Sequence, residues 1–287
     1  MANENPIPLQ QFESNTYSQF GEDGIIAECL SRISSVAPLD KWCVEFGAWD
    51  GVHLSNTCRL IREEEYSAVL VEGSKERFSE LEKNLPEPRV HKIHRWVSLS
   101  GDGRLEMILE QTPLPRDFDL LSIDIDSCDW HIWNSIENYR PKIVVIEFNP
   151  TIPNCVSYVQ PPEFSLRQGN SARAIDDLAR EKNYVLVAAT LVNLIYVENA
   201  FADAVLGAER PDLTDLRDEE GKVSYVFSGY NGEIICTGPV QLFWHGMQIT
   251  PRRLQMLSRF LHKFPDEYSW WQAALFKIIS RFYRQRY

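Results

Sequence analysis

Apolar residues in the first two hundred positions follow two alternating spacings. Five short stretches are rich in apolar residues and predict buried strands, at 42–46, 68–71, 90–97, 118–125 and 142–148. Between them, and before the first, apolar residues recur every three to four positions, as in Ile25, Ile26, Cys29, Leu30 and Ile33. These stretches predict helices. Strands that each precede a helix predict a parallel sheet with helices on both faces.

The pattern continues after a proline-rich link with a predicted helix at 171–180 and two strands at 184–189 and 194–197. A final antiparallel hairpin on a parallel sheet is typical of a seven-stranded Rossmann-like fold. Beyond residue 201 the pattern predicts a hairpin around Asn231-Gly232 and an amphipathic helix near the end, with a basic opposite face. We therefore expect a helical cap at 1–40, a ligand-binding sheet domain at 41–200 and a C-terminal extension at 201–287.

Composition narrows the class of protein. The 287 residues are 44% hydrophobic and 24% charged, which excludes a disordered chain. The net charge of −12 disfavours nucleic acid as a partner. Residues 251–287, however, carry eight basic and two acidic side chains, a local charge of +6. Six scattered cysteines without a CxxC pair, a polar start and the lack of a long apolar run predict a reduced, cytoplasmic protein.

Acidic and glycine residues gather where the predicted strands end. They follow the first, second, fourth and fifth strands: Gly47 and Gly51, Glu72, Asp124 and Asp126, and Glu147 and Asn149. Ligands bind open parallel sheets at the carboxyl ends of the strands. Each residue alone has an ordinary explanation as a turn, a helix cap or a solvated acid. Together, in order, they predict a ligand site.

The turn after the first strand bears on the kind of ligand. Its glycines are spaced Gly47-x-x-x-Gly51, unlike the G-x-G-x-x-G turn of dinucleotide sites, and no nucleotide-triphosphate loop is present. Asp50 inside the turn would repel a pyrophosphate and tolerate an amino group. S-adenosylmethionine, which has a ribose, an adenine and an ammonium group but no phosphate, fits better.

Several motifs together resemble the FkbM-type S-adenosylmethionine-dependent methyltransferases. They run in order from residue 17 to about 200: 18–24 (SQFGEDG), 44–51 (VEFGAWDG), 70–72 (LVE), 119–126 (DLLSIDID), 141–149 and 169–184. The resemblance implies a class I methyltransferase sheet. It also implies O-methylation of a hydroxyl on a glycan or secondary metabolite.

The resemblance further implies roles for individual residues. The cofactor would contact Glu45, Gly47, Ala48 and Gly51 near its methionine part, Glu72 at the ribose, Val97 and Ser98 beside Trp96 at the adenine, and Asp124 near the methyl donor. Asp124 and Asp126 match a segment that reads Asp-x-Glu-Gly in the family. Here Asp126 replaces the glutamate and Ser127 the glycine. That departure affects any role inferred for this turn.

Methyl transfer to a hydroxyl needs alignment and removal of a proton. The bases near the donor are Asp124, Asp126, Asp129, His131 and Glu147, of which we single out His131, Asp124 and Asp126 as catalytic candidates. An aspartate is a poor base unless burial raises its pKa, whereas histidine is matched to neutral pH. His131 is equally interpretable as a solvated residue on the following helix.

Three polar or aromatic side chains beside the predicted mouth are candidates for substrate contact: Asn149, Trp130 and Asn56. A divalent metal such as Mg²⁺ is an alternative at Asp124, Asp126 and Glu147, because carboxylates are hard oxygen ligands. We favour no metal, with these acids capping helices and binding the cofactor.

Two other functions remain open, a binding or scaffold protein on this fold and, less favoured, an NAD-dependent oxidoreductase. A homo-oligomer is possible, and so is peripheral membrane contact through the basic C-terminal helix.

Overall fold

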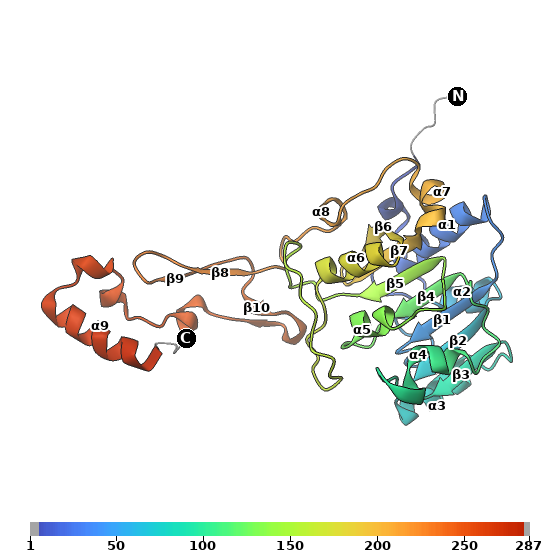
Figure 1. The fold of residues 1–287 in the computed structure, drawn as a ribbon, viewed down its shortest axis with the longest axis horizontal. Helices are drawn as coiled ribbons and strands as arrows, with labels where there is room; N and C mark the ends of the chain where they lie inside the picture. The colour runs from blue at the N-terminus through green and yellow to red at the C-terminus, as the bar shows by residue number, and fades with distance from the viewer. Residues whose placement is uncertain (1–5, 284–287) are drawn as a thin grey trace. The chain divides into compact units, whose positions relative to one another are not determined.

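The computed structural model describes residues 6–283, without the side chain of the last of these, so that Arg284 and Arg286 of the basic tail lie outside it. The chain forms two compact units, residues 1–218, called the sheet unit below, and residues 219–287, called the C-terminal unit (Figure 1). The first unit thus includes residues 201–218, which were expected in the C-terminal extension, and the expected N-terminal cap at 1–40.

The sheet unit is built on seven strands in the order β3-β2-β1-β4-β5-β7-β6. They are β1 Trp42–Phe46, β2 Ser67–Glu72, β3 Val90–His94, β4 Leu120–Ile123, β5 Ile143–Glu147, β6 Tyr184–Ala189 and β7 Asn193–Glu198. β7 runs antiparallel to both neighbours, and the other pairings are parallel. The predicted Rossmann-like, mostly parallel sheet with an antiparallel last hairpin is confirmed.

Two strands are shorter than the sequence pattern predicts. β3 ends at His94 rather than at Val97, because the chain turns away and the Ser98 N–H donates to the carbonyl of Gly103 over 2.8 Å. β4 comprises four residues, all buried, and ends at Ile123 rather than Ile125. The earlier end leaves Asp124 in the loop beyond the sheet.

Helices cover both faces of the sheet (Figure 1). The bounds are α1 Glu22–Ser34, α2 Cys58–Glu63, α3 Lys75–Asn84, α4 Leu105–Leu109, α5 Asp129–Asn134, α6 Ala172–Glu181, α7 Ala202–Leu206 and α8 Leu213–Leu216, with short 3₁₀ turns η1 Leu9–Phe12, η2 Gly101–Gly103 and η3 Asn199–Phe201. One apolar core contains residues of α4, α5, α6 and α8, and the other contains residues of α1, α2, α3 and α7.

Serine residues precede and cap two of these helices. The hydroxyls of Ser74 and Ser171 accept backbone N–H groups in the first turns of α3 and α6.

The strand order reverses between β1 and β4, which are direct neighbours although three helices separate them in sequence. Phe46 and Ile123 are register partners at the ends of these strands. The loops that follow, beginning with Gly47 and Asp124, therefore leave the sheet side by side. In open α/β sheets this switch point is where ligands bind.

The C-terminal unit consists of small elements. They are β8 Tyr225–Ser228 and β9 Ile234–Thr237, β10 Gln241–Leu242 and β11 Met247–Gln248, the 3₁₀ turns η4 Phe243–His245, η5 Pro251–Leu254, η6 Arg259–Leu261 and η7 Pro265–Glu267, and helix α9 Trp270–Tyr283. β8 and β9 pair antiparallel, so the predicted hairpin is confirmed. No helix within residues 6–283 is both long and apolar enough to cross a membrane.

Candidate functional site

Three carboxylates meet at the carboxyl edge of the sheet. Asp124 and Asp126 follow β4, and Glu147 ends β5. One oxygen from each lies within 4.8 Å of the others, and we call these three residues the acidic cluster. Asp124 and Glu147 are largely enclosed, whereas Asp126 is exposed. The sequence argument, which placed these acids at adjacent strand ends, correctly brings them together.

Two members of the acidic cluster, Asp124 and Glu147, have raised pKa values. Burial, followed by the negative charges of Asp129 and Asp126, raises the pKa of Asp124 to about 8. Burial and the charge of Asp124 raise the pKa of Glu147 to about 10, and the two side chains are hydrogen-bonded. The neighbouring charges with the largest effect on the pKa of Asp124, those of Asp129, Asp126, Glu45 and Glu22, are all acidic.

The raised pKa of Glu147 predicts a pH dependence of stability. A glutamic acid in the unfolded chain has a pKa of about 4.3. Between that pH and about 10, the folded protein therefore binds one proton at Glu147 that the unfolded chain has lost. Its contribution is complete below the unfolded pKa and is lost as the pH rises through the folded pKa. We expect the melting temperature of the wild type to fall more steeply between pH 6 and 10 than that of Glu147→Gln. Glu181→Gln, at the exposed end of α6, is the matched control. Parallel slopes in all three proteins would contradict the assignment.

Asp129 shapes the loop that carries Asp124 and Asp126. Its two carboxylate oxygens accept the N–H groups of Ile125 and Ser127 over 2.9 and 3.0 Å. The left-handed residue of this loop is Asp126, at φ 57°, and aspartate tolerates that conformation better than most side chains. Ser127, where the resembling family has glycine, instead donates its hydroxyl to the Leu166 carbonyl over 2.8 Å. The turn thus takes its left-handed conformation at Asp126, and Ser127 binds a second loop.

The N-terminal motif, residues 18–24, reaches the same edge of the sheet. The buried Glu22 carboxylate accepts hydrogen bonds from the Thr190 hydroxyl and the Asn193 amide, over 2.6 and 3.0 Å. Asn193 is the register partner of Glu147, and the charge of Glu22 adds to the raised pKa of Asp124. The Asn193 Oδ1 atom is buried and has no hydrogen-bond partner among the described residues. In the sequence, this contact could have been suspected from Asn193, the polar residue that begins the largely apolar strand β7.

The glycine turn packs tightly against its neighbours. At Gly47, φ is +69°, and an added Cβ would lie 1.9 Å from the main-chain oxygen of Asp124. At Gly51, φ is +76°, and a Cβ would lie 2.4 Å from Leu81. Ala48 is buried in the core. These contacts require small residues whether or not a ligand is bound.

Glu72 joins the turn to the end of β2. One of its carboxylate oxygens accepts the Trp49 N–H over 2.9 Å, and the other accepts the Ser74 N–H over 2.6 Å. Each carboxylate oxygen can accept a second hydrogen bond. Glu72 is therefore positioned at the switch point and retains acceptor capacity for a ligand hydroxyl.

Glu45 and Asn56 lie beneath the turn in a buried network. The Glu45 carboxylate accepts bonds from the Ser55 hydroxyl, the Asn56 N–H and the Thr57 hydroxyl. Burial raises its pKa above the ordinary value. The Asn56 amide donates to the Ser122 hydroxyl over 3.0 Å. In this structure both side chains are engaged in holding the loop between β1 and α2.

The segment after β3 carries the residues expected at an adenine. Val97 packs against the core, and the Ser98 hydroxyl donates to the Ser100 carbonyl over 2.7 Å. Trp96 is 73% exposed. Its ring packs over Gly73, where an added Cβ would lie 2.3 Å from the ring atoms. An aromatic face is therefore available beside the end of β2.

Three further candidates contact other parts of the sheet unit. His131 Nε2 lies 2.8 Å from the Gln160 carbonyl oxygen, and the Trp130 indole donates to the Ala174 carbonyl over 3.0 Å. The Asn149 amide donates to the Gln168 carbonyl, while its Oδ1 accepts from Thr151. His131 and Asn149 thus help to hold segment 149–170, and Trp130 joins α5 to α6.

Taken together, the switch point is suited to a cation. It combines the acidic cluster with Asp129, Glu45 and Glu22, whose charges all disfavour ionisation of Asp124. A divalent metal or an organic cation would relieve this repulsion. An anionic pyrophosphate would increase it.

No protein-family model and no curated protein matches this sequence. Solved structures with similar folds include S-adenosylmethionine-dependent methyltransferases. A putative O-methyltransferase from Klebsiella pneumoniae is 14% identical, with a TM-score of 0.39 over 67% of this chain and 86% of that one. A methyltransferase from Aquifex aeolicus is 10% identical, with a TM-score of 0.39 over 66% and 95%. A TehB-like methyltransferase from Corynebacterium glutamicum is 10% identical, with a TM-score of 0.37 over 60% and 87%.

Proposed function

We propose that the chain is a class I S-adenosylmethionine-dependent methyltransferase of the FkbM type that methylates a hydroxyl group. The observation that carries this proposal is the acid-lined switch point, where Asp129, Asp126, Glu45 and Glu22 are the charges with the largest effect on the pKa of Asp124. S-adenosylmethionine brings a sulfonium and an ammonium and has no phosphate. The unpartnered Asn193 Oδ1 is a further acceptor for a cationic N–H group. The N-terminal and strand-end motifs support the same family.

Under this proposal the turn at Gly47, Ala48 and Gly51 adjoins the methionine part, and Glu72 accepts the ribose hydroxyls. Val97 and Ser98 adjoin the adenine, with Trp96 offering a ring face. When bound, S-adenosylmethionine supplies an electrophilic methyl group. Glu45 supports the turn from below.

Asp124 is the base that we favour. Its raised pKa, about 8, is close to the working pH, which is the condition for efficient proton transfer. Deprotonated Asp124 accepts the proton of the acceptor hydroxyl, and the protonated Glu147 stabilises it by a hydrogen bond. Asp126, exposed beside it, orients the acceptor. His131 remains the alternative base.

The acceptor is proposed from the resemblance as a glycan or secondary-metabolite hydroxyl, with Asn149, Trp130 and Asn56 shaping its surroundings. A second candidate is a metal-assisted reaction, because the acidic cluster has the donor chemistry for Mg²⁺. Such a metal would acidify the hydroxyl and orient it. Cytoplasmic localisation is proposed with the enzyme, as four of its cysteines are buried free thiols.

Calorimetric titration tests the cofactor. We expect S-adenosylmethionine and sinefungin, which carries an amine at the sulfonium position, to bind more tightly than the neutral thioether S-adenosylhomocysteine. NAD should not bind. Each titration is repeated with Mg²⁺ and with EDTA, because a metal requirement would support the metal-assisted form.

Glu72→Ala provides the matched variant, since it removes the ribose acceptor, one bond to the glycine turn and one bond to Ser74. We expect at least tenfold weaker binding of S-adenosylmethionine. Glu80→Ala, on the solvent side of α3, should bind as the wild type does. Folded wild-type protein that binds no S-adenosylmethionine would overturn the proposal and favour a scaffold, and NAD binding would favour an oxidoreductase.

A further inference from the structure

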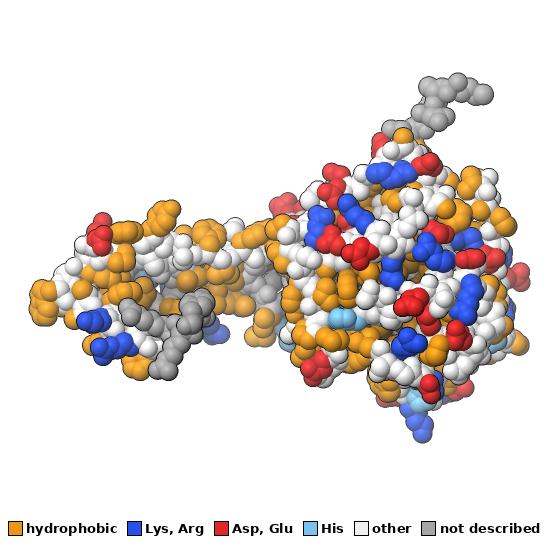
Figure 2. All heavy atoms as spheres, in the orientation of Figure 1, with side chains coloured by type: hydrophobic (Ala, Val, Ile, Leu, Met, Phe, Trp, Pro, Cys, Tyr) orange, Lys and Arg blue, Asp and Glu red, His pale blue; other side chains and the backbone are white. Residues whose placement is uncertain are grey.

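Helix α9 presents large apolar side chains to solvent. Trp271, Ile278 and Phe282 are 46%, 56% and 81% exposed. They are spaced by seven and four residues, which places them on one side of the helix. Trp270 is 84% exposed. Trp270 lies about 100° around the helix from Trp271, so we call only Trp271, Ile278 and Phe282 the apolar stripe. In Figure 2 apolar side chains cover much of the visible face of the C-terminal unit.

The other side of α9 is attached to its own unit. Gln272 is buried, and its amide donates to the Phe260 carbonyl over 2.7 Å. The Phe276 ring lies 5.4 Å from that of Tyr268. Because these contacts orient the helix, the exposure of the apolar stripe follows from its fixed orientation.

Basic side chains accompany the apolar stripe. Lys277 and Arg281 are exposed and precede Ile278 and Phe282 by one residue, which is about 100° around the helix. They therefore border the stripe on one side. α9 carries no acidic residue. An apolar stripe bordered by cations is typical of helices that lie in the surface of an anionic membrane.

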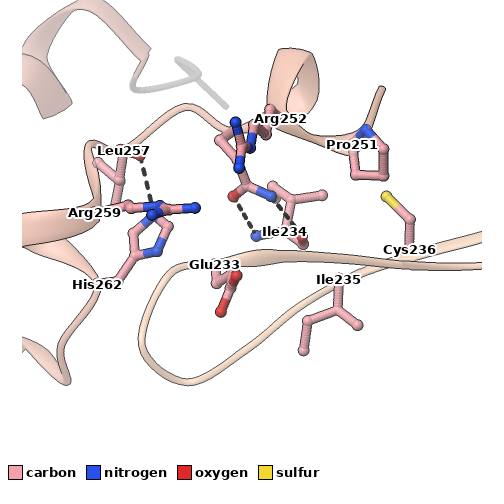
Figure 3. Close-up of a pocket in the computed structure, with 10 residues that line it drawn as sticks. Glu233, Ile234, Ile235, Cys236, Pro251, Arg252, Leu257, Arg259 and His262 are labelled. Atoms are coloured by element: carbon pink, nitrogen blue, oxygen red, sulfur yellow. Dashed lines mark hydrogen bonds between the residues drawn. The ribbon is translucent and has the colours of Figure 1, made fainter. Parts of the chain in front are cut away.

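A cationic pocket lies beside the point where α9 is attached. It has a volume of about 600 Å³ and is formed by β9 and residues 251–262, including Arg252, Arg259 and His262 (Figure 3). Arg259 directly precedes Phe260, whose ring lies 5.9 Å from that of Trp271. Glu233 is the acidic residue in its lining. Two guanidinium groups are well suited to a phosphate oxyanion.

We propose that the C-terminal unit binds the surface of an anionic lipid bilayer. The apolar stripe enters the boundary between headgroups and acyl chains, Lys277 and Arg281 pair with anionic headgroups, and the pocket receives a lipid phosphate. This inference does not depend on the proposed enzyme activity.

Charge favours a bilayer over a second copy of the chain. Two α9 helices that met through their apolar stripes would offer Lys277 and Arg281 no acidic partner, because α9 contains no acidic residue. An anionic bilayer provides both apolar depth for the stripe and negative charge for its borders. Each basic residue near such a surface contributes on the order of 1 kcal/mol.

Co-sedimentation of the full chain with vesicles tests the proposal. We expect binding to vesicles of 60% phosphatidylcholine and 40% phosphatidylserine at low salt, little binding to pure phosphatidylcholine, and loss at 0.5 M NaCl. Removing one charge by Arg281→Gln should weaken binding about fivefold. Ile278→Ser and Phe282→Ser should each weaken it by a similar factor or more, and Arg252→Gln should lower the preference for anionic lipid.

Tyr230→Ser is the matched control, because this residue is 92% exposed in the β8–β9 turn and lies outside α9. It should bind vesicles as the wild type does. Folded wild-type protein that stays in the supernatant at low salt overturns the proposal. The proposal is also overturned if sedimentation velocity shows a dimer, Phe282→Ser dissociates it and the wild type does not bind vesicles. The apolar stripe would then contact a second copy of the chain. Retained binding in the α9 variants, with loss in the control, also contradicts it.

Discussion

Asp124→Asn is expected to lower the rate of methyl transfer by about 100- to 10,000-fold, the range associated with a positioned general base. The amide cannot accept the proton, but it keeps the shape of the side chain and its hydrogen bond with Glu147. Because burial and neighbouring acids raise the pKa of Asp124 to about 8, kcat/KM of the wild type should rise from pH 7 to 9. That rise should disappear in the variant. Steady-state assays across this pH range measure both effects.

The matched control is Asp203→Asn, an exposed carboxylate on α7 that pairs with Arg210. Its rate should match that of the wild type. The decisive comparison is with His131→Gln, which tests the alternative base. If this substitution abolishes turnover while Asp124→Asn retains the wild-type rate and pH profile, the proton acceptor is His131 and our assignment fails.

Gly47→Ala should cause the largest loss of stability among single substitutions at the site. Its Cβ would lie 1.9 Å from the main-chain oxygen of Asp124, so the loops after β1 and β4 would have to separate. We expect the free energy of unfolding to fall by at least about 3 kcal/mol, as for other large steric defects. Urea unfolding measures this loss. Binding of S-adenosylmethionine should weaken in parallel.

Gly101→Ala separates this clash from backbone strain. Gly101 has nearly the same φ, +68° against +69°, but nothing lies within 4 Å of its added Cβ. Its substitution should therefore cost only the left-handed strain of about 1 to 2 kcal/mol. Equal losses in both variants would show that the contact with Asp124 contributes nothing.

The site was partly predictable, because the ends of the strands and their order along the chain can be recognised from short stretches of sequence. Asp124, Asp126 and Glu147 follow recognisable buried strands, and the parallel arrangement places such ends at one edge. The contacts of Glu22 were not predictable, because it meets Thr190 across 168 positions of sequence. The roles of His131 and Asn149 likewise depend on where segment 149–170 folds back.

The sequence by itself determined the fold class, because continuous apolar runs bury strands and helical spacing buries one helix face. It also determined which carboxylates end the central strands, and that the last helix is amphipathic. The tertiary structure decided the rest. Burial among other acids sets the pKa of Asp124, and close approach of the β1 and β4 loops makes Gly47 necessary. The contacts of Gln272 and Phe276 with their own unit determine that the apolar stripe of α9 faces solvent. Each of these depends on contacts between distant segments, which no local pattern contains.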